Sequence, residues 1–593
     1  MALLEVSELS IRYADSAKPA VSDLSFTVEP GQSLGIVGES GSGKTQTAMA
    51  VMGLLPANAM INGSIRFDGQ EFLGAPPAVL NRYRACRIAM VFQDPMTALN
   101  PYVRVGDQLR RVLLEHKICD ATEARERTLA MLKKVGLPDA ERQYGVYPHQ
   151  LSGGMRQRAM IGAALIGQPD LLVADEPTTA LDVTVQAQIL GLLRELRSQS
   201  NTALLLITHD LGVVAGNCDH LLMMDDGRLL EEGSTQRIFM APSNERTAKL
   251  ISTSPRIDMP AKISPLPGGV APIMDIDEIS VSFTEHGASG KGQLNAVRSL
   301  SLKLAPGETI AVVGESGSGK TSLARAVLGL IRPRSGTVSY AGKELPGLVQ
   351  SRPNAIRRQL QMVFQDPATS LNPAMRVAEI VAEPISIHEP RKKKAARELE
   401  VNEMLQHVGL GIDLRDRFPH ELSGGQAQRV AIARALVIRP KVLVCDEAVA
   451  ALDGTIQSDI LHLLQAEQAD SGLSLIFITH DLSVVRRISH RVLVLYLGRV
   501  CEVATNEQLF KKPQHPYTKA LLSSVPVPDP NARPHDAPIA GEASSILNPP
   551  AGCPFHPRCQ HSVARCSAEI PQLESNDGVS VACHRASELD LSY

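Results

Sequence analysis

The sequence Gly-Glu-Ser-Gly-Ser-Gly-Lys-Thr occurs twice, at residues 38–45 and 314–321. Both copies fit the phosphate-binding pattern G-x-x-x-x-G-K-S/T, in which the lysine reaches the β- and γ-phosphates and the last hydroxyl binds Mg²⁺. Small residues let the backbone N–H groups point inward around an anion at the start of a helix. A surface turn is the alternative, and two identical copies argue against it. The residues predicted to bind nucleotide are Gly38, Ser40, Gly41, Ser42, Gly43, Lys44 and Thr45, and Gly314, Ser316, Gly317, Ser318, Gly319, Lys320 and Thr321.

Two acidic pairs follow apolar segments. Asp175 and Asp446 each come after four apolar residues, which is typical of a buried parallel strand that ends at a ligand crevice. An aspartate there can bind Mg²⁺ directly or through water, and the adjacent Glu176 or Glu447 can activate or orient an attacking water. A carboxylate that caps the next element is an equally good interpretation of either pair alone.

Three further motifs recur in the same order in both halves of the chain. They are Val-Phe-Gln-Asp-Pro around Gln93 and Gln365, Leu-Ser-Gly-Gly at 151–154 and 422–425, and Ile-Thr-His-Asp at 207–210 and 478–481. A period this long indicates a duplicated domain and not a solenoid of short repeats.

Each glycine loop has the local context that a phosphate site requires. Apolar strands are expected at Ser33–Val37 and Thr309–Val313, and helices at Gln46–Leu55 and Ser322–Leu330. The order strand, glycine loop, helix supports a nucleotide site in both halves.

The intervening segments define the predicted domains. Residues 109–150 and 377–421 are charged at i, i+4 spacing and are expected to form a helical lobe in each half. Proline-rich stretches mark a linker and a C-terminal break. The predicted domains are a first cassette at 1–251, a linker at 252–272, a second cassette at 273–524 and an extension at 525–593.

Composition excludes several classes of protein. The 593 residues carry 44% hydrophobic and 21% charged side chains, as in a globular protein with a large core. A net charge of −3 implies no bulk attraction to nucleic acid or anionic lipid. The sequence has no apolar run of about 18 residues and no signal-peptide pattern at its start, so we expect a cytosolic protein that reaches a membrane only through partners.

Together these motifs resemble the ATP-binding cassette (ABC) ATPases over nearly the whole chain, and Leu-Ser-Gly-Gly separates this family from other P-loop NTPases. The resemblance implies an α/β fold with two cassettes, each a RecA-like core with an inserted helical subdomain and an antiparallel β subdomain. It also implies head-to-tail pairing of the cassettes within the chain. One ATP would then lie between Lys44 and the loop of Ser423, Gly424 and Gly425, and the other between Lys320 and the loop of Ser152, Gly153 and Gly154.

The resemblance assigns the remaining roles. Gln93 and Gln365 would sense the metal and the attacking water, and His209 and His480 would contact the γ-phosphate, although a lone histidine is more often structural. The implied catalytic residues are Glu176, Glu447, His209, His480, Gln93 and Gln365. The implied Mg²⁺ residues are Thr45, Gln93, Asp175, Thr321, Gln365 and Asp446.

Two further pairs of residues are implied to lie near the nucleotide. Asp182 and Asp453, in Ala-Leu-Asp, would belong to the loop that communicates between cassettes. Tyr13 and Phe283 would stack on adenine, with packing into a sheet as the alternative.

The halves differ beside these motifs. Pro-Thr-Thr-Ala at 177–180 corresponds to Ala-Val-Ala-Ala at 448–451, and Met155-Arg156-Gln157 corresponds to Gln426-Ala427-Gln428. Because no reactive residue is lost, both sites are expected to hydrolyse ATP, and the second could be slower.

Four of the nine cysteines cluster near the C-terminus, with five, six and sixteen intervening residues. Four thiolates can hold Zn²⁺ or an iron–sulfur cluster. The first spacing is long for zinc, nearby His556, His561 and His584 keep zinc open, and four unrelated cysteines are the third interpretation. The cysteines are Cys553, Cys559, Cys566 and Cys583.

The tail narrows the resemblance. His-Pro-Tyr-Thr-Lys at 515–519 and Cys-Pro-Phe-His-Pro-Arg-Cys at 553–559 resemble the C-terminal extension of oligopeptide and dipeptide importer ATPases, a group that includes nickel and glutathione importers. In that group the cysteines are associated with a 4Fe–4S cluster. The resemblance implies ATP, Mg²⁺ and the cluster as cofactors, and a peripheral place at the cytoplasmic face of a bacterial inner membrane. The implied partners are two permease subunits and, through them, an extracytoplasmic solute-binding protein. The rival hypothesis is a non-transport ABC protein of translation or DNA repair.

Overall fold

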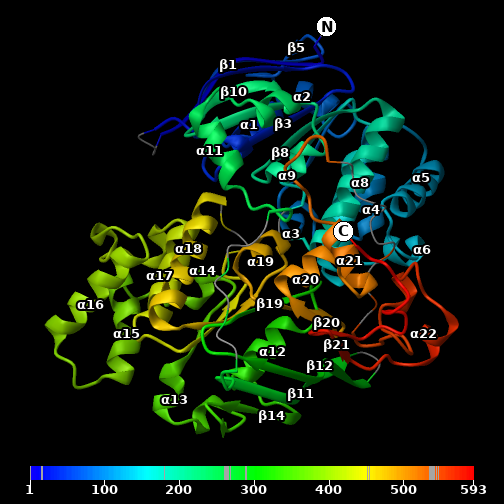
Figure 1. Cartoon of the computed structure of the whole chain (residues 1–593). Coiled ribbons are helices and arrows are strands. Elements are labelled where there is room, and N and C mark those ends of the chain that lie inside the picture. Colours follow the sequence, from blue (N-terminus) through cyan, green and yellow to red (C-terminus); the bar gives the residue numbers. More distant parts are fainter. Residues whose placement is uncertain are drawn as a thin grey trace. The chain divides into compact units, whose positions relative to one another are not determined.

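The computed structural model describes residues 2–14, 18–178, 181–259, 263, 266, 269–287, 290–449, 452, 454–532, 541, 544 and 546–592. The chain forms two compact units (Figure 1), the first with most of residues 1–254 and the second with most of residues 255–593. No helix among the described residues is both long and apolar enough to span a membrane.

Unit 1 is built on a six-stranded sheet. Its strand order is β10 (Arg228–Ser234), β9 (His220–Asp225), β3 (Ser33–Gly38), β8 (Ala203–Thr208), β7 (Leu171–Asp175) and β6 (Ile88–Val91). All neighbours are parallel except the β9–β10 pair. Every residue of β3, β7 and β8 is buried, as expected of parallel strands covered on both faces.

An antiparallel sheet and a helical lobe complete unit 1. The sheet has the order β2 (Val21–Val28), β1 (Leu4–Tyr13), β4 (Ala59–Phe67) and β5 (Gln70–Glu71). The helices are α1 (Lys44–Val51), α2 (Pro77–Tyr83), α3 (Pro95–Ala98), α4 (Val105–Glu115), α5 (Ala121–Lys134), α6 (Ala140–Tyr144), α7 (Gly153–Leu165), α8 (Val183–Ser200), α9 (Leu211–Ala215), α10 (Thr235–Met240) and α11 (Glu245–Thr253), with a 3₁₀ turn at Pro148–Gln150.

Unit 2 has the same plan and a longer sheet. The order is β16 (Leu360–Val363), β17 (Val442–Asp446), β18 (Ser474–Ile478), β13 (Thr309–Val313), β19 (Arg491–Tyr496), β20 (Arg499–Thr505), β22 (Val579–Val581) and β21 (Glu574–Asn576). Because β22 pairs with β20, the C-terminal segment adds two strands to the sheet. The second sheet has the order β12 (Gly290–Leu304), β11 (Met274–Gly287), β14 (Ser335–Tyr340) and β15 (Lys343–Glu344).

The helices of unit 2 follow the order of those in unit 1 up to the tail, except that a 3₁₀ turn at Ile412–Leu414 stands in the place of α6. They are α12 (Lys320–Val327), α13 (Asn354–Gln359), α14 (Pro367–Ser370), α15 (Val377–His388), α16 (Lys394–His407), α17 (Gly424–Leu436), α18 (Gly454–Ser471), α19 (Leu482–Ile488), α20 (Asn506–Lys511), α21 (Pro516–Ser523) and α22 (Ala564–Ala568). The 3₁₀ turns are at Val349–Ser351, Ile412–Leu414, Pro419–Glu421 and His556–Arg558.

The helices after the two glycine loops differ from the sequence-based expectation. They begin at Lys44 and Lys320, and they end four and three residues early, at Val51 and Val327. Gly53 and Gly329 follow these ends with φ of 62° and 74°, and a left-handed glycine is a common helix stop. The hydrophobic core packs α1 between the antiparallel sheet and one face of the parallel sheet, which fixes where the loop before α1 lies.

Candidate active sites

The first glycine loop connects the end of β3 to the start of α1. Gly43 has φ of 92°, and a Cβ there would lie 2.4 Å from the carbonyl oxygen of Ala20, so only glycine fits. The buried Lys44 donates from Nζ to the carbonyl oxygens of Gly38 and Glu39, each at 2.8 Å. The ammonium group is therefore held across the mouth of the loop, where a phosphate would sit.

The second loop repeats this geometry between β13 and α12. Gly319 has φ of 103°, and a Cβ would lie 2.1 Å from the carbonyl oxygen of Ala296. Lys320 Nζ donates to the carbonyl oxygens of Gly314 at 2.8 Å and Glu315 at 3.0 Å. Burial lowers the pKa of Lys320, because desolvation disfavours the charged ammonium.

Each loop threonine contacts the aspartate that ends the second strand away in the parallel sheet, β7 in unit 1 and β17 in unit 2. Thr45 Oγ1 donates to Asp175 Oδ1 at 3.2 Å, and Thr321 Oγ1 donates to Asp446 Oδ1 at 3.1 Å. Burial raises the pKa of Asp175 to about 6 against the opposing Thr45 hydrogen bond, and burial also raises the pKa of Asp446. A hydroxyl and a carboxylate oxygen this close are a donor set that fits Mg²⁺.

In unit 1 three of the residues predicted to be catalytic come together, with Gln93 and His209 both in contact with Glu176. Gln93 Nε2 donates to Glu176 Oε2 at 3.0 Å, and His209 Nδ1 lies 3.1 Å from Glu176 Oε1. They arrive from the ends of β6, β7 and β8, whose carboxyl ends share one edge of the sheet. This edge is where open α/β sheets bind ligands.

Unit 2 assembles the same three groups. Gln365 Nε2 donates to Glu447 Oε2 at 2.7 Å, and His480 Nδ1 lies 3.6 Å from Glu447 Oε1. The contact with His480 lowers the pKa of Glu447. Burial lowers the pKa of His480, but the contact with Glu447 outweighs it, so the pKa of His480 is raised. The pair is thus biased towards carboxylate and imidazolium.

Both glutamates have left-handed backbones, with φ of 45° at Glu176 and 49° at Glu447. Their N–H groups donate to the carbonyl oxygens of Ile207 and Ile478, at 2.8 Å and 2.9 Å. Strain of this kind persists where the surroundings enforce it and is concentrated at functional sites. Because the same backbone strain recurs at matched positions of the two units, it indicates that the surrounding structure holds both carboxylates in a required orientation.

The two Leu-Ser-Gly-Gly motifs form helix starts. Ser152 caps α7 and accepts from the N–H of Met155, and Ser423 caps α17 and accepts from the N–H of Gln426. Only the second forms a reciprocal capping box, because Gln426 can bond back to the N–H of Ser423 and a methionine cannot. Exposed N–H groups at a helix start favour an anion.

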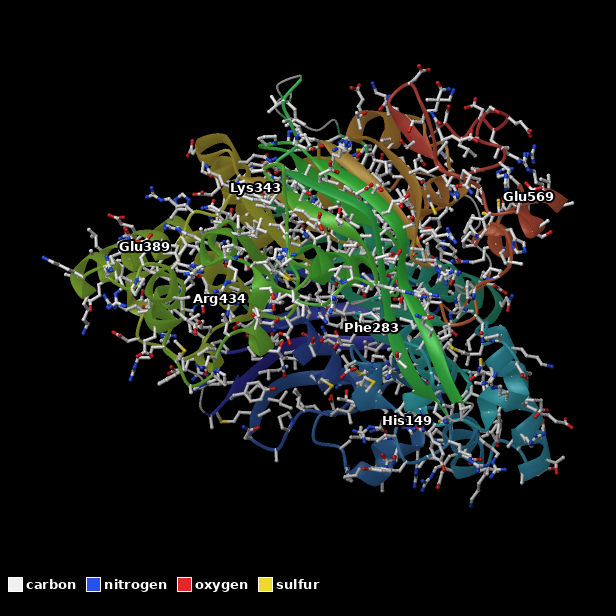
Figure 2. All side chains as sticks on the ribbon, turned by 90° about the horizontal axis from the view of Figure 1, so that it is seen from below. His149, Phe283, Lys343, Glu389, Arg434 and Glu569 are labelled. Carbon is white, nitrogen blue, oxygen red and sulfur yellow. The ribbon has the colours of Figure 1, made fainter. Side chains whose placement is uncertain are left out.

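The remaining predicted residues are placed as follows. Tyr13 ends β1 and its hydroxyl bonds Gln46 on α1. Phe283 lies on β11 with 41% of its surface exposed and is labelled in Figure 2, so its ring is open to a ligand. Asp182 directly precedes α8, and Asp453 lies outside the described residues.

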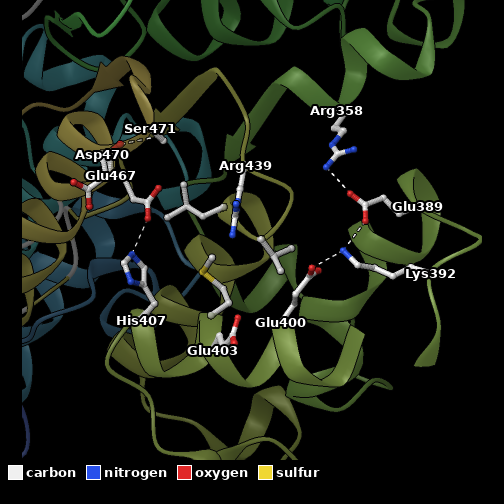
Figure 3. A pocket seen from close by; sticks show the side chains of 13 residues that line it. Arg358, Glu389, Lys392, Glu400, Glu403, His407, Arg439, Glu467, Asp470 and Ser471 are labelled. Atoms are coloured by element: carbon white, nitrogen blue, oxygen red, sulfur yellow. Dashed lines mark hydrogen bonds and ion pairs between the residues drawn. The ribbon is translucent and has the colours of Figure 1, made fainter. Parts of the chain in front are cut away.

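A separate cavity of about 560 Å³ in unit 2 contains none of the predicted residues. Figure 3 shows its charged lining, in which Arg358 pairs with Glu389, Lys392 bridges Glu389 and Glu400, and His407 contacts a glutamate of α18. Because none of the residues predicted to bind nucleotide lines it, this cavity is not part of the predicted nucleotide site.

The family model "ABC transporter" matches residues 21–179 and 297–450. The chain belongs to the ABC transporter ATPases. It is 41% identical over 565 residues to the glutathione import ATP-binding protein GsiA of Pectobacterium atrosepticum, covering 90% of both chains. It is also 41% identical over 528 residues to the uncharacterized ABC transporter ATP-binding protein YejF of Escherichia coli, covering 88% of this chain and 99% of the relative.

A second family model and one solved structure complete these findings. "Oligopeptide/dipeptide transporter, C-terminal region" matches residues 501–566. A dimeric ATP-binding cassette with bound ADP and Pi is 25% identical, with a TM-score of 0.36, over 39% of this chain and 98% of that one. The two family models and the relatives, and not this structural likeness, show that the protein is an ATPase of the ABC type, an ATP-binding subunit of the peptide and glutathione import group.

The expectation of an iron–sulfur cluster is wrong. The four C-terminal cysteines do line one small cavity, but its volume is about 20 Å³, room for about one water molecule. No group of three or more His, Cys, Asp or Glu in the described part of the chain, which includes all four cysteines, could hold a metal ion. Burial raises the pKa of Cys553 to about 11, which disfavours the thiolate that a metal requires.

The expectation of a tandem repeat is also not supported by the relatives: GsiA is named a glutathione import ATP-binding protein and YejF an uncharacterized ABC transporter ATP-binding protein.

Sequence reasoning missed two residues of the tail that contact the second loop. Arg558 and Tyr517 both bond Glu315, over separations of 243 and 202 residues. Both lie inside motifs quoted for the tail, but a motif match gives no contact partner. It also missed that Asp210 and Asp481, next to the two histidines, cap α9 and α19.

Replacement of one loop lysine should remove one of two bound nucleotides. In Lys44→Met or Lys320→Met the phosphates lose their cation, so we expect ATP stoichiometry to fall from two to one in equilibrium dialysis. Lys18→Met, at an exposed pair with Asp226, is the control and should bind as the parent does. Unchanged stoichiometry in either loop variant would exclude that loop as a site.

Proposed function

We propose that the protein energises an importer of di- or oligopeptides or glutathione by hydrolysing ATP at two sites. One observation supports this proposal. Each unit places a buried lysine, a threonine–aspartate pair and a glutamine–glutamate–histidine cluster at the carboxyl edge of its parallel sheet. Such an arrangement suits phosphoryl transfer, in which catalysis consists mainly of positioning and charge stabilisation.

The division of labour follows from the contacts. The lysine and the loop N–H groups bind the phosphates, and Glu176 or Glu447 accepts a proton from the attacking water. The glutamine amide and the histidine ring hold that carboxylate in place through hydrogen bonds and charge. Mg²⁺, held by the threonine and the aspartate, would neutralise charge on the phosphate oxygens.

The finer arrangement rests on the family resemblance. We propose that the ATP at Lys44 is completed by the Ser423 loop and the ATP at Lys320 by the Ser152 loop. The cap geometry supports this role, because both serines are exposed at a helix start.

We also propose the remaining partners from the relatives and the tail. Two permease subunits would bind the protein at the cytoplasmic face of a bacterial inner membrane, and a solute-binding protein would deliver the cargo. GsiA's name specifies glutathione, and the tail model's description specifies oligopeptides and dipeptides. Both cargoes carry amide bonds and terminal charges.

Removal of each carboxylate tests two-site hydrolysis. In Glu176→Gln and Glu447→Gln the proton acceptor is lost, so each variant should lose half or more of its steady-state turnover. The double variant should lose about 100-fold or more. Parental turnover in either single variant would refute two working sites. Glu574→Gln, on the exposed strand β21, is the control.

If each ATP site is shared between the two halves of the chain, a substitution in the Leu-Ser-Gly-Gly motif of one half should reduce turnover at the lysine of the other half. In Glu447→Gln only the first carboxylate is active, and we expect Ser423→Arg to reduce the residual turnover more than tenfold because the bulky side chain occupies the γ-phosphate position. Ser152→Arg should have the smaller effect in this background. The opposite order would show that each signature serves its own loop.

The proteins that co-purify with this chain distinguish the transport hypothesis from the non-transport hypothesis. Affinity-purified protein from its native cells should carry two permease subunits, identified by mass spectrometry. Ribosomal proteins or DNA-repair proteins in their place would favour the rival hypothesis.

A further inference from the structure

The two glycine loops are identical in sequence but differ in their surroundings. Glu39, the second residue of the first loop, is partly exposed, whereas Glu315 in the second is 5% exposed. Because the loops cannot differ through their own residues, the difference comes from the structure around them.

Glu315 accepts at Oε1 from Thr184 Oγ1 at 2.7 Å, and it is also held by two residues that come more than 200 positions later in the chain. Its carboxylate accepts a bidentate pair of hydrogen bonds from Arg558, Nη1 to Oε2 at 2.7 Å and Nη2 to Oε1 at 3.0 Å. Its backbone N–H donates to the hydroxyl of Tyr517 at 2.9 Å. Both side chains are buried, so these bonds form away from competing water.

The extension is itself anchored to the core of unit 2. Arg558 ends the 3₁₀ turn between Cys553 and Cys559 and also donates to the hydroxyl of Tyr496 on β19 at 3.3 Å. The rings of Tyr496, Tyr517 and Phe555 pack with centroids 4.7 to 5.5 Å apart. The turn that carries Arg558 therefore cannot move without disturbing this aromatic cluster.

Glu315, which Arg558 and Tyr517 hold, also contacts Lys320, the lysine predicted to bind phosphate. The carbonyl oxygen of Glu315 accepts from Lys320 Nζ at 3.0 Å, so displacement of Glu315 displaces an anchor of the ammonium group. The N–H of Glu315 points to Tyr517, which fixes the peptide orientation at the start of the loop. A phosphate loop binds well only when its amides and lysine are already in place.

We propose that the C-terminal extension positions the second phosphate loop through Arg558 and Tyr517, so that ATP affinity at the second site, and not at the first, depends on the extension. The inference rests on the proposed function only in assuming that this loop binds ATP. Arg558 and Tyr517 touch no nucleotide in this scheme and are positioning residues. The first half of the chain has no counterpart of the cysteine-containing tail.

The test isolates each site. In a Glu176→Gln parent, where the second site supplies the turnover, Arg558→Met should raise KM for ATP by about tenfold or more, with a smaller change in kcat. Arg558→Lys keeps the charge but loses the bidentate geometry, so its KM for ATP should lie between that of the Glu176→Gln parent and that of Arg558→Met. Tyr517→Phe should raise KM several-fold. In a Glu447→Gln parent, which reports on the first site, all three changes should leave KM within about twofold.

The matched control is Arg565→Met. Arg565 lies on α22 of the same extension but forms an exposed i, i+4 pair with Glu569, so KM should stay at the parental value. Equal KM values for Arg558→Met and Arg565→Met would overturn the proposal.

A folding defect is separated by a second pair of variants. Removal of one partner leaves a buried charge unpaired, whereas removal of both does not. If Arg558→Met lowers the calorimetric Tm, Glu315→Gln with Arg558→Met should recover it while KM stays raised. If the double variant Glu315→Gln with Arg558→Met has the parental Tm and also the parental KM for ATP, the proposal is overturned.

Failure of the proposed function gives a different result. If the Glu176→Gln parent shows no turnover, two-site hydrolysis fails. Binding of a fluorescent ATP analogue to Lys44→Met, in which only the second loop is intact, then decides the role of Arg558. A Kd unchanged by Arg558→Met overturns the inference, and a Kd raised about tenfold supports it.

Discussion

The register of the parallel strands fixes the chemistry of each unit. In unit 1, Val37 at the end of β3 is level with Thr208 on β8, and Asp175 on β7 is level with Ile207. The phosphate loop, the acidic pair and the histidine therefore leave the sheet at one edge. A slip of one residue would turn each side chain to the opposite face and would separate the threonine from the aspartate.

Burial of the parallel strands determines the electrostatics of the groups at this edge of the sheet. Strands covered on both faces place their last side chains at the border between an apolar core and water. In unit 2 the same desolvation raises the pKa of Asp446 and lowers that of Lys320, so both groups favour a ligand that restores their charged forms. A phosphate with its metal ion is such a ligand.

Local features could be predicted from the sequence. The glycine loops, the strands before them and the strand-end carboxylates depend on residues close in the chain, and β13 has the predicted bounds, Thr309–Val313. Helix ends were less accurate because Gly53 and Gly329 stop the helices by their backbone conformation. The contact of Arg558 with Glu315 was beyond reach, because nothing in either motif encodes a partner 243 residues away. The cluster expected from the cysteine spacing failed for the same reason, since spacing does not fix the volume among the side chains.

The buried pair of Arg558 and Glu315 has a physical meaning beyond stability. Desolvation of two charges consumes much of what their attraction returns, so an apolar pair of similar volume would hold the tail about as well. What an apolar pair could not do is fix direction: the planar guanidinium binds both carboxylate oxygens and sets the orientation of Glu315. The same residue bonds Tyr517 through its N–H and Lys320 through its carbonyl oxygen. The orientation of Glu315 therefore bears on Lys320, the cation that we propose binds phosphate, and the two identical loop sequences have different surroundings in the two halves of the chain.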